Sequence, residues 1–274
     1  MKIRNFALSF AVGVVALTGA GSAAVIDLGF SLDRSSSVGS IDYNSARTAL
    51  SQALGSIPTS GDNQYRIAVT SFAGGSTTIV APTIVSDATL AGIQSDVANA
   101  PYSGGGTNIA GAISNLFGLF QSSADGLGAT TLLNITTDGG SSVTASKSVA
   151  TAARTAGLDG LSFEAVGPGP RLESLRQIAG LGTVGDEDNG VIVDLAAGDT
   201  IPDATATGFV VSVSDFDAYA GAIGTKINQV VDDTGGEVDN PTPGPSVVPL
   251  PAGLPLILTG LVALLGLGRF RRPA

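Results

Sequence analysis

One predicted strand of this chain runs directly into three oxygen-bearing side chains, an arrangement that other segments of the chain must make specific. Between residues 26 and 32, apolar side chains alternate with small or polar ones, which is the period of a β-strand. The alternation stops at Asp33, and Ser35 and Ser37 follow in the spacing D-x-S-x-S. Hydroxyl and carboxylate oxygens are the ligands that hard cations such as Mg²⁺ prefer. This loop can therefore supply part of a coordination shell, which other segments must complete.

Two later segments offer further oxygen ligands. Thr107 follows three consecutive glycines and precedes a helix-like apolar stripe. A second apolar strand, over residues 129–137, delivers Asp138 into a Gly-Gly turn. Taken alone, Asp138 is a common turn residue before glycine. A phosphate-binding role for the glycine loop is disfavoured because no Gly-Lys-Ser/Thr sequence follows it.

Together these motifs, in this order, resemble the von Willebrand factor type A (vWA) domain with its metal-ion-dependent adhesion site (MIDAS). The resemblance implies that Ser35, Ser37 and Thr107 offer hydroxyl oxygens to one divalent cation. It also implies that Asp33 and Asp138 hold this ion largely through water. Mg²⁺ is the expected ion, with Mn²⁺ or Ca²⁺ as alternatives.

The first loop departs from the family pattern at one position. Ser36 stands where the family most often has glycine, and Arg34 precedes the serines. These two residues are expected to change loop conformation and local charge, and hence the affinity of the site. Arg34 is either a contact for a carboxylate of the partner or a solvated loop residue.

The rest of the chain alternates strand and helix patterns. Strands are predicted at 26–32, 65–72, 77–80, 129–137, 161–166 and 209–213, and helices at 41–54, 90–97, 107–120, 145–156, 172–178 and 216–230. Ser40 is predicted to cap the first helix. Such alternation predicts an α/β fold with a mostly parallel central sheet and helices on both faces. The vWA resemblance makes this fold Rossmann-like, with 77–80 as one antiparallel edge strand.

The composition excludes several kinds of chemistry. The chain has no cysteine and no histidine, so it cannot form a disulfide, a Ser-His-Asp triad or a Cys-His pair. Lys147 and Lys226 are the only lysines outside the N-terminal segment, and neither is near the site motifs in sequence. We therefore predict a protein without catalysis. The enzymatic alternative is a metal-dependent hydrolase in which Asp33 or Asp138 acts as base, although both are needed for the ion.

Two further motifs are interpreted as structural. Residues 180–185 match G-x-G-x-x-G, but they follow a helix pattern instead of a strand, which argues against a dinucleotide site. The acidic residues 186–188 and Asp194 resemble part of a calcium loop. Its glycine is misplaced and the bidentate glutamate is absent, so a solvated acidic loop is preferred, with weak Ca²⁺ binding left open.

Both ends of the chain carry export signals. Residues 1–24 combine Lys2 and Arg4, an apolar run shorter than the roughly 20 residues of a membrane span, and a small-residue cleavage region, as in a signal peptide. The vWA domain is assigned to 25–231 and a Pro/Gly-rich linker to 232–247. Residues 248–274 combine the sequence VPLPA, an apolar stretch and three arginines. This tail resembles the PEP-type sorting signals of Gram-negative bacteria, which implies processing by an exosortase. A simple membrane anchor is the alternative.

Charge restricts the partners. Of the 13 Lys and Arg, five lie in the terminal segments, so residues 25–247, the module with its linker, carry 8 basic residues against 23 Asp and Glu, a net charge of about −15. Such a surface repels nucleic acids and anionic membranes, and the membrane is met only through the C-terminal segment. The expected function is that of an exported cell-surface or matrix module, which binds a protein or other ligand whose carboxylate reaches the cation. The alternative is a structural surface protein whose metal serves only stability.

Overall fold

The computed structural model describes residues 23–183 and 190–235, which belong to one compact unit, Met1–Asp239. Nearly all of the predicted signal peptide, the acidic residues 186–188 and the C-terminal sorting tail lie outside the described residues. Among the described helices, none is both long enough and apolar enough for a membrane span.

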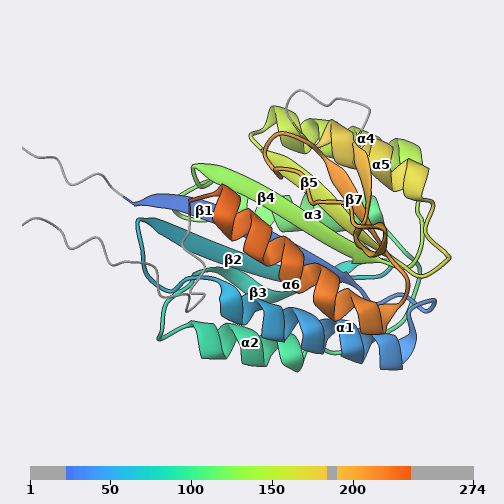
Figure 1. Ribbon diagram of the computed structural model, residues 1–274, viewed down its shortest axis with the longest axis horizontal. Coiled ribbons are helices and arrows are strands. Elements are labelled where there is room, and N and C mark those ends of the chain that lie inside the picture. Colours follow the sequence, from blue (N-terminus) through green and yellow to red (C-terminus); the bar gives the residue numbers. More distant parts are fainter. Residues whose placement is uncertain (1–22, 184–189, 236–274) are drawn as a thin grey trace, which may run out of the picture. The chain divides into compact units, whose positions relative to one another are not determined.

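The described residues form one seven-stranded sheet with the order β3-β2-β1-β4-β5-β7-β6 (Figure 1). Its strands are β1 (Ala24–Asp33), β2 (Asn63–Phe72), β3 (Ser76–Ile84), β4 (Thr130–Thr137), β5 (Gly160–Val166), β6 (Val191–Asp194) and β7 (Phe209–Val213). All neighbouring strands are parallel except β2 and β3. The predicted Rossmann-like α/β fold, with one antiparallel edge strand, is confirmed.

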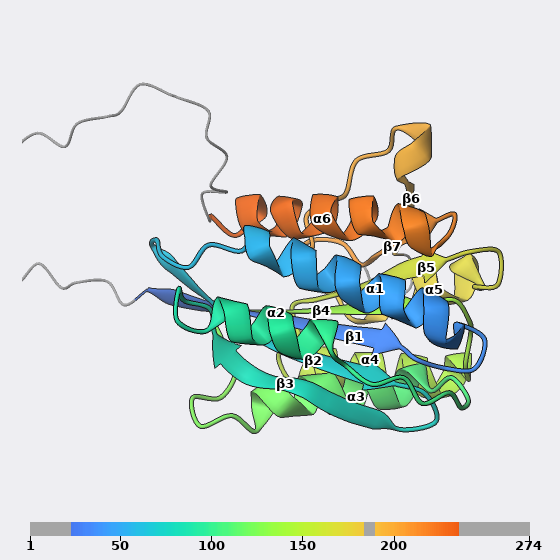
Figure 2. The ribbon, with the colours of Figure 1, turned by 90° about the horizontal axis from the view of Figure 1, so that it is seen from below.

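Helices cover both faces of this sheet (Figure 2). One layer contains α1 (Gly39–Ala53), α2 (Leu90–Ala98) and α6 (Phe216–Asp233), and the other contains α3 (Ile109–Gln121), α4 (Val143–Thr155) and α5 (Leu172–Leu181). Each layer buries its own apolar cluster against the sheet, so the central strands are covered on both sides. Only the edges and the strand ends remain available for a ligand.

The central strand β1 shows how the sequence builds this arrangement. Its even-numbered residues from Ile26 to Leu32 are apolar and pack into the cluster beneath α1 and α6. On the opposite face, a Cβ atom on Gly29 would lie 2.6 Å from a methyl carbon of Leu133 and 2.9 Å from Leu116 of α3. Glycine at this position therefore allows α3 to pack closely against the sheet.

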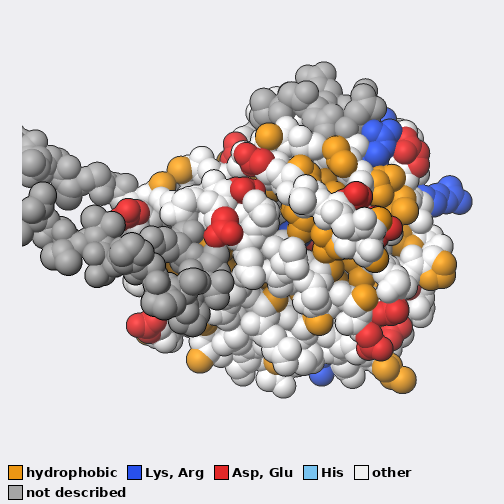
Figure 3. Space-filling view, in the orientation of Figure 1, with side chains coloured by type: hydrophobic (Ala, Val, Ile, Leu, Met, Phe, Trp, Pro, Cys, Tyr) orange, Lys and Arg blue, Asp and Glu red, His pale blue; other side chains and the backbone are white. Residues whose placement is uncertain are grey.

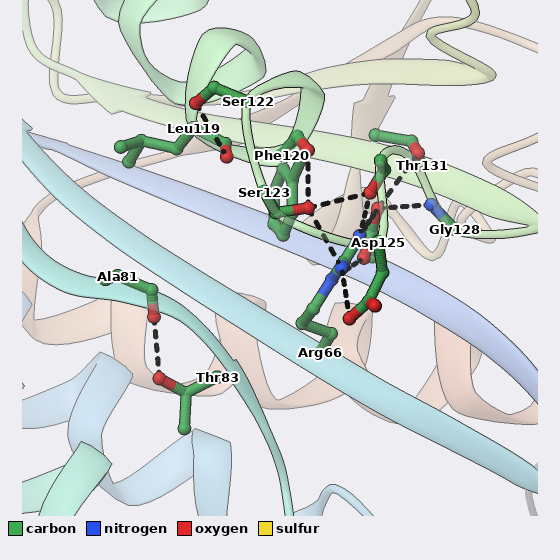
Figure 4. A network of polar contacts seen from close by, with 12 residues as sticks. Arg66, Ala81, Thr83, Leu119, Phe120, Ser122, Ser123, Asp125, Gly128 and Thr131 are labelled. Carbon is green, nitrogen blue, oxygen red and sulfur yellow. Dashed lines mark hydrogen bonds and ion pairs between the residues drawn. The ribbon is translucent and has the colours of Figure 1, made fainter.

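The odd-numbered Asp27 is buried at the amino end of β1 and pairs with Arg66 of β2. Figure 4 shows Arg66 among its neighbours Ser123, Asp125, Gly128 and Thr131. Arg66 donates from Nε to Asp27 Oδ1 at 2.7 Å and from Nη2 to Oδ2 at 2.8 Å. The backbone of Gly128 and the hydroxyl of Thr131 donate to the same carboxylate. A buried charge is tolerated when it is paired and hydrogen-bonded in this way. This network lies at the strand end opposite the candidate site.

Three local predictions are corrected by the structure. Helix α1 begins at Gly39, whose φ is +73°, and its N-cap is Val38, so Ser40 lies inside the helix and does not cap it. Strand β3 has nine residues instead of the predicted four. The structure also contains β6, which the sequence analysis missed because a partly exposed strand of four residues has too few positions to show a period.

Strand β6 also changes the interpretation of Asp194. This residue ends β6, and its Oδ1 accepts hydrogen bonds from the backbone nitrogens of Ala196 and Ala197 at 3.0 and 3.3 Å. It thereby caps a short 3₁₀ turn (Leu195–Ala197). Asp194 thus belongs to a strand end and not to the solvated acidic loop that was predicted.

Candidate metal centre

Asp33 and Asp138 follow the carboxyl ends of two adjacent strands. Asp33 is the last residue of β1, and Asp138 comes directly after β4, which pairs with β1 in parallel. Ligands in open parallel sheets bind beyond the carboxyl ends of the strands, close to a switch in strand order. The sheet order places β1 between β2 and β4, so its carboxyl end lies at such a switch.

The serines connect the two aspartates. Ser35 Oγ lies 3.0 Å from Ser37 Oγ, and Ser37 Oγ donates to Asp138 Oδ1 at 2.8 Å. Asp33 Oδ1 accepts from the backbone nitrogen of Ser35 at 2.8 Å, and Asp33 Oδ2 accepts from Thr137 Oγ1 at 2.7 Å. Four of the five predicted ligands are therefore joined by one continuous set of hydrogen bonds.

Thr107 reaches the same place from the glycine loop, residues 104–106. A Cβ atom on Gly139 would lie 3.5 Å from Thr107 Oγ1 and 3.9 Å from Ser37 Oγ. Both hydroxyls thus flank the turn that follows Asp138. The structure brings all five predicted residues to one edge of the sheet, and their role as metal ligands stays a prediction.

Ser36, the departure from the family pattern, fastens the first loop to the glycine loop. Its backbone nitrogen donates to the carbonyl of Gly105 at 2.9 Å, and its Oγ accepts from the backbone nitrogen of Gly105 at 2.9 Å. Gly104 and Gly105 have φ of +69° and +121°, which other residues rarely adopt. No sequence pattern signalled this pair of bonds, because the two residues are 69 positions apart.

Other positioning residues carried a partial signal. Asn108 caps α3, since its Oδ1 accepts from the backbone nitrogen of Gly111 at 2.9 Å, and this fixes the helix start directly after Thr107. Asparagine before a helical stripe is a recognisable N-cap. Thr137 holds Asp33 through its hydroxyl, but in the sequence it is only one more residue of a strand.

Arg34 is engaged with the sheet edge. Its Nη2 donates to Thr77 Oγ1 of β3 at 2.7 Å, and its backbone nitrogen donates to Phe72 O at 2.8 Å. The guanidinium is thus held toward β3, so the geometry favours neither of the two roles considered for Arg34, a partner contact or a solvated loop residue.

The two carboxyl groups are held where negative charge is unfavourable. Burial raises the pKa of Asp33 from 3.8 to about 6, partly offset by the hydrogen bonds from Thr137 and Ser35, and the charge of Asp138 raises it further. Burial also raises the pKa of Asp138, with a contribution from nearby Asp42. A cation at this edge would relieve both effects.

The donor set fits a hard divalent cation. It consists of hydroxyl and carboxylate oxygens, which suit Mg²⁺, Mn²⁺ or Ca²⁺ better than softer metals. Within residues 23–183 and 190–235, no group of three or more His, Cys, Asp or Glu side chains could hold a metal ion. Any ion here would therefore depend on the three hydroxyl groups.

The fold and the oxygen cluster define an α/β domain with a candidate cation-binding edge. The chain belongs to the von Willebrand factor type A domain family, whose model matches residues 27–220. No curated protein matches the chain in sequence.

Solved structures share the fold at low identity. A von Willebrand factor type A structure from Catenulispora acidiphila is 13% identical with a TM-score of 0.56, and covers 76% of this chain and 43% of that one. Proximal thread matrix protein 1 of the mussel byssus, with a zinc-occupied MIDAS motif, is 18% identical with a TM-score of 0.53, covering 76% and 45%. The pilus adhesin SpaC of Lactobacillus rhamnosus GG is 13% identical with a TM-score of 0.54, covering 76% and 31%. The chain thus spans less than half the length of each structure.

Proposed function

We propose that this chain is an exported interaction module, which binds a protein or other ligand through a divalent cation at a MIDAS. The observation that carries this proposal is the convergence of three hydroxyl and two carboxyl side chains, from three separate loops, at the carboxyl edge of β1 and β4. Membership of the vWA family supports it. Two of the structures with the same fold are by name a matrix protein and an adhesin, which agrees with such a role.

The hydroxyl and carboxyl groups of the site have different roles in holding the ion. Ser35, Ser37 and Thr107 supply hydroxyl oxygens, whereas Asp33 and Asp138 supply charge and act largely through water. When bound, the cation would supply a positive charge to which a carboxylate of the partner could coordinate. The bonds between the first loop and the glycine loop keep these hydroxyls in place before the ion arrives.

A groove beside the site defines the kind of partner further. It is lined by Ser37 and Asp138 and by three more acidic side chains, Asp42, Asp215 and Asp217. On the face drawn in Figure 3, acidic side chains are spread widely whereas basic ones gather in few places. A fitting partner carries a basic group next to the carboxylate that reaches the metal, and nucleic acids are disfavoured.

Export is proposed from the two ends of the chain. The N-terminal segment 1–24 resembles a signal peptide, and the tail 248–274 resembles an exosortase sorting signal with an apolar span and a basic end. The proposal places the module at the outer surface, with the tail either cleaved or kept as an anchor.

A non-catalytic role is preferred to hydrolysis. A hydrolase would need Asp33 or Asp138 as base, but Asp33 accepts two hydrogen bonds and Asp138 accepts one from Ser37. Both carboxylates are also needed for the proposed cation, so a catalytic base would have to come from the residues that hold the ion. A purely structural metal remains the second candidate, and it differs in predicting no metal-dependent partner.

Thermal unfolding tests the metal site. The full chain is stripped with chelator and titrated with Mg²⁺ and with Mn²⁺, beside the double variant Asp33→Ala/Asp138→Ala. A binding site should stabilise the fold by about 2.7 kcal/mol at a hundred times the dissociation constant. The control variant Asp96→Ala/Asp125→Ala removes the same charge from exposed positions and should keep the metal response. A native protein that ignores both metals would refute the site.

A displayed peptide library tests the partner. In Mg²⁺, the selected peptides should be rich in Asp or Glu next to Lys or Arg, and chelator or the double variant should abolish this enrichment. A protein that is stabilised by metal but selects no carboxylate peptides would leave the structural role as the better account.

A further inference from the structure

A second polar cluster lies inside the domain, between the sheet and α6. It consists of Asn134 on β4, Glu164 on β5 and Lys226 on α6, which are 5%, 0% and 3% exposed. The cluster takes no part in the metal centre. Lys226 is a lysine that the site motifs left unexplained.

The sheet register places the first two members on one face. Asn134 is opposite Ser162, and Thr136 is opposite Glu164, in the parallel pair β4–β5. Side chains two positions apart on a strand share a face, so Asn134 and Glu164 both point toward the helix that covers it. Helix α6 lies on that face and buries Lys226 between turns that carry apolar side chains.

The three side chains contact one another in a closed triangle. Lys226 Nζ donates to Glu164 Oε1 at 2.7 Å and also to Asn134 Oδ1. Asn134 Nδ2 donates to Glu164 Oε2 at 2.7 Å. One carboxyl group therefore bridges the lysine amine and the nitrogen of the asparagine carboxamide, while the amine touches the oxygen of the same carboxamide.

Burial favours a neutral, nucleophilic amine on Lys226, whereas the carboxyl group of Glu164 and the ring face of Phe209 favour the charged form. The ring centre of Phe209 lies 5.0 Å from Lys226 Nζ, and a small, mostly apolar cavity adjoins the cluster. Burial lowers the pKa of Lys226, although Glu164 opposes this effect. Desolvated lysines are activated in this way for attack on carbonyl carbons.

We propose that Lys226 and Asn134 form an intramolecular isopeptide bond, with Glu164 as the proton carrier. Lys226 Nζ bonds to the carboxamide carbon of Asn134, and the bond from that carbon to Nδ2 breaks. Glu164 accepts one proton from Nζ at Oε1, and the same carboxyl group passes one proton to Nδ2, so that ammonia leaves and the protonation state of Glu164 is the same before and after. No oxidant or other reactant is required, and the charge is balanced.

Two neighbouring hydroxyls assist this step. Ser162 Oγ lies 3.4 Å from Asn134 Oδ1 and can donate to the oxygen on which negative charge develops. Thr136 Oγ1 donates to Glu164 Oε2 at 3.0 Å and fixes the carboxyl group in its bridging position.

The bond would join β4 in the middle of the sheet to α6, across 92 positions of the chain. A chain without cysteine has no disulfide to serve this purpose. Among the described elements, helix α6 is the last one before the predicted C-terminal tail, so a pull on that tail would reach the sheet through a covalent link. This mechanical benefit rests on the proposed surface attachment, whereas the bond itself does not.

Mass spectrometry of the unfolded, digested full chain tests the proposal. Trypsin should fail to cleave after Lys226, and the peptides containing Asn134 and Lys226 should appear as one species, lighter than their sum by the mass of one ammonia molecule. Free forms of both peptides in stoichiometric amount, with normal cleavage after Lys226, would overturn the proposal and leave a buried ion pair only. This readout does not depend on metal, so it is independent of the proposed function.

Variants assign the roles. Glu164→Gln keeps the size of the side chain but removes the proton carrier, and it should yield the free peptides with Lys226 and Asn134 still present. Lys147→Arg, on a partly exposed position of α4, should leave the linked species unchanged. Full linkage in a folded Glu164→Gln protein would refute the role of Glu164. If that variant does not fold, the native digest still decides whether the bond exists.

Discussion

The raised pKa of Asp33 predicts that the metal-free protein becomes less stable as the pH rises. Burial places the folded-state pKa at about 6, above the ordinary value of 3.8. Folding therefore favours the protonated form of Asp33. This contribution is fully present below about pH 4 and is lost as the pH rises through about 6.

The size of the effect follows from the shift. A difference of about two pKa units corresponds to about 3 kcal/mol in the free energy of unfolding, at about 1.4 kcal/mol per unit. Asp33 is 2% exposed, so solvent screening reduces this value little. Asp138 titrates in the same direction, and a reference variant is needed to separate the two.

Asp33→Asn is that reference. The carbonyl oxygen of the new asparagine can still accept a hydrogen bond from the backbone nitrogen of Ser35. Its amide nitrogen can donate to the hydroxyl of Thr137, which then accepts a hydrogen bond instead of donating one. Urea unfolding in chelator is measured for both proteins across the range from about pH 4 to about pH 7. The native protein should lose up to about 3 kcal/mol relative to the variant over this window.

Saturating Mg²⁺ should flatten this pH dependence, because the ion stabilises the ionised carboxylate. A difference between native protein and variant that stays constant with pH in chelator would refute the reasoning. So would a difference that grows in favour of the native protein as the pH rises.

Three further substitutions, with a fourth as a control, test the residues that support the site and the fold. Ser36→Gly removes one hydrogen bond to the glycine loop and should cost about 1 kcal/mol in urea unfolding, with weaker Mg²⁺ binding by calorimetry. Gly169→Ala would place a Cβ atom 2.4 Å from the carbonyl oxygen of Asp138, so it should displace that residue and weaken Mg²⁺ binding, while far-ultraviolet circular dichroism stays unchanged. Arg66→Met leaves the buried Asp27 without its partner and should lower the free energy of unfolding by about 3–5 kcal/mol, measured by urea unfolding. As a control, Asp125→Ala, at the exposed end of the same network, should lower it by less than about 1 kcal/mol.

The strand and helix patterns were sufficient to predict the fold class. Apolar residues alternate in β1 and recur at helical spacing in α3 and α6. These patterns predict strands and helices because each element buries one face, so that buried positions repeat with the period of the element. The same reasoning failed for β6, whose four residues are mostly exposed, and for the start of α1, where Gly39 has positive φ and no capping side chain is used.

The five candidate ligands were also predictable, because each one stands at a strand end or a helix start, next to a change of pattern. The hydrogen bonds from Ser36 and Thr137 that hold these residues in place could not be predicted. The bonds of Ser36 to Gly105 and of Thr137 to Asp33 join positions 69 and 104 residues apart. Such contacts depend on which loops lie next to each other in the fold. The hydrophobic periodicity of a single segment carries no information about that.

The sequence by itself determined most of the elements of this protein and the residue types at the ends of its strands, since these follow from the burial and backbone preferences of each segment. The tertiary structure alone decided that Lys226 meets Asn134 and Glu164. That meeting requires β4 to lie beside β5 and α6 to cover both, an order set by the packing of the whole sheet. Which distant segments lie side by side depends on the packing of the whole chain, and the sequence of one segment does not specify it.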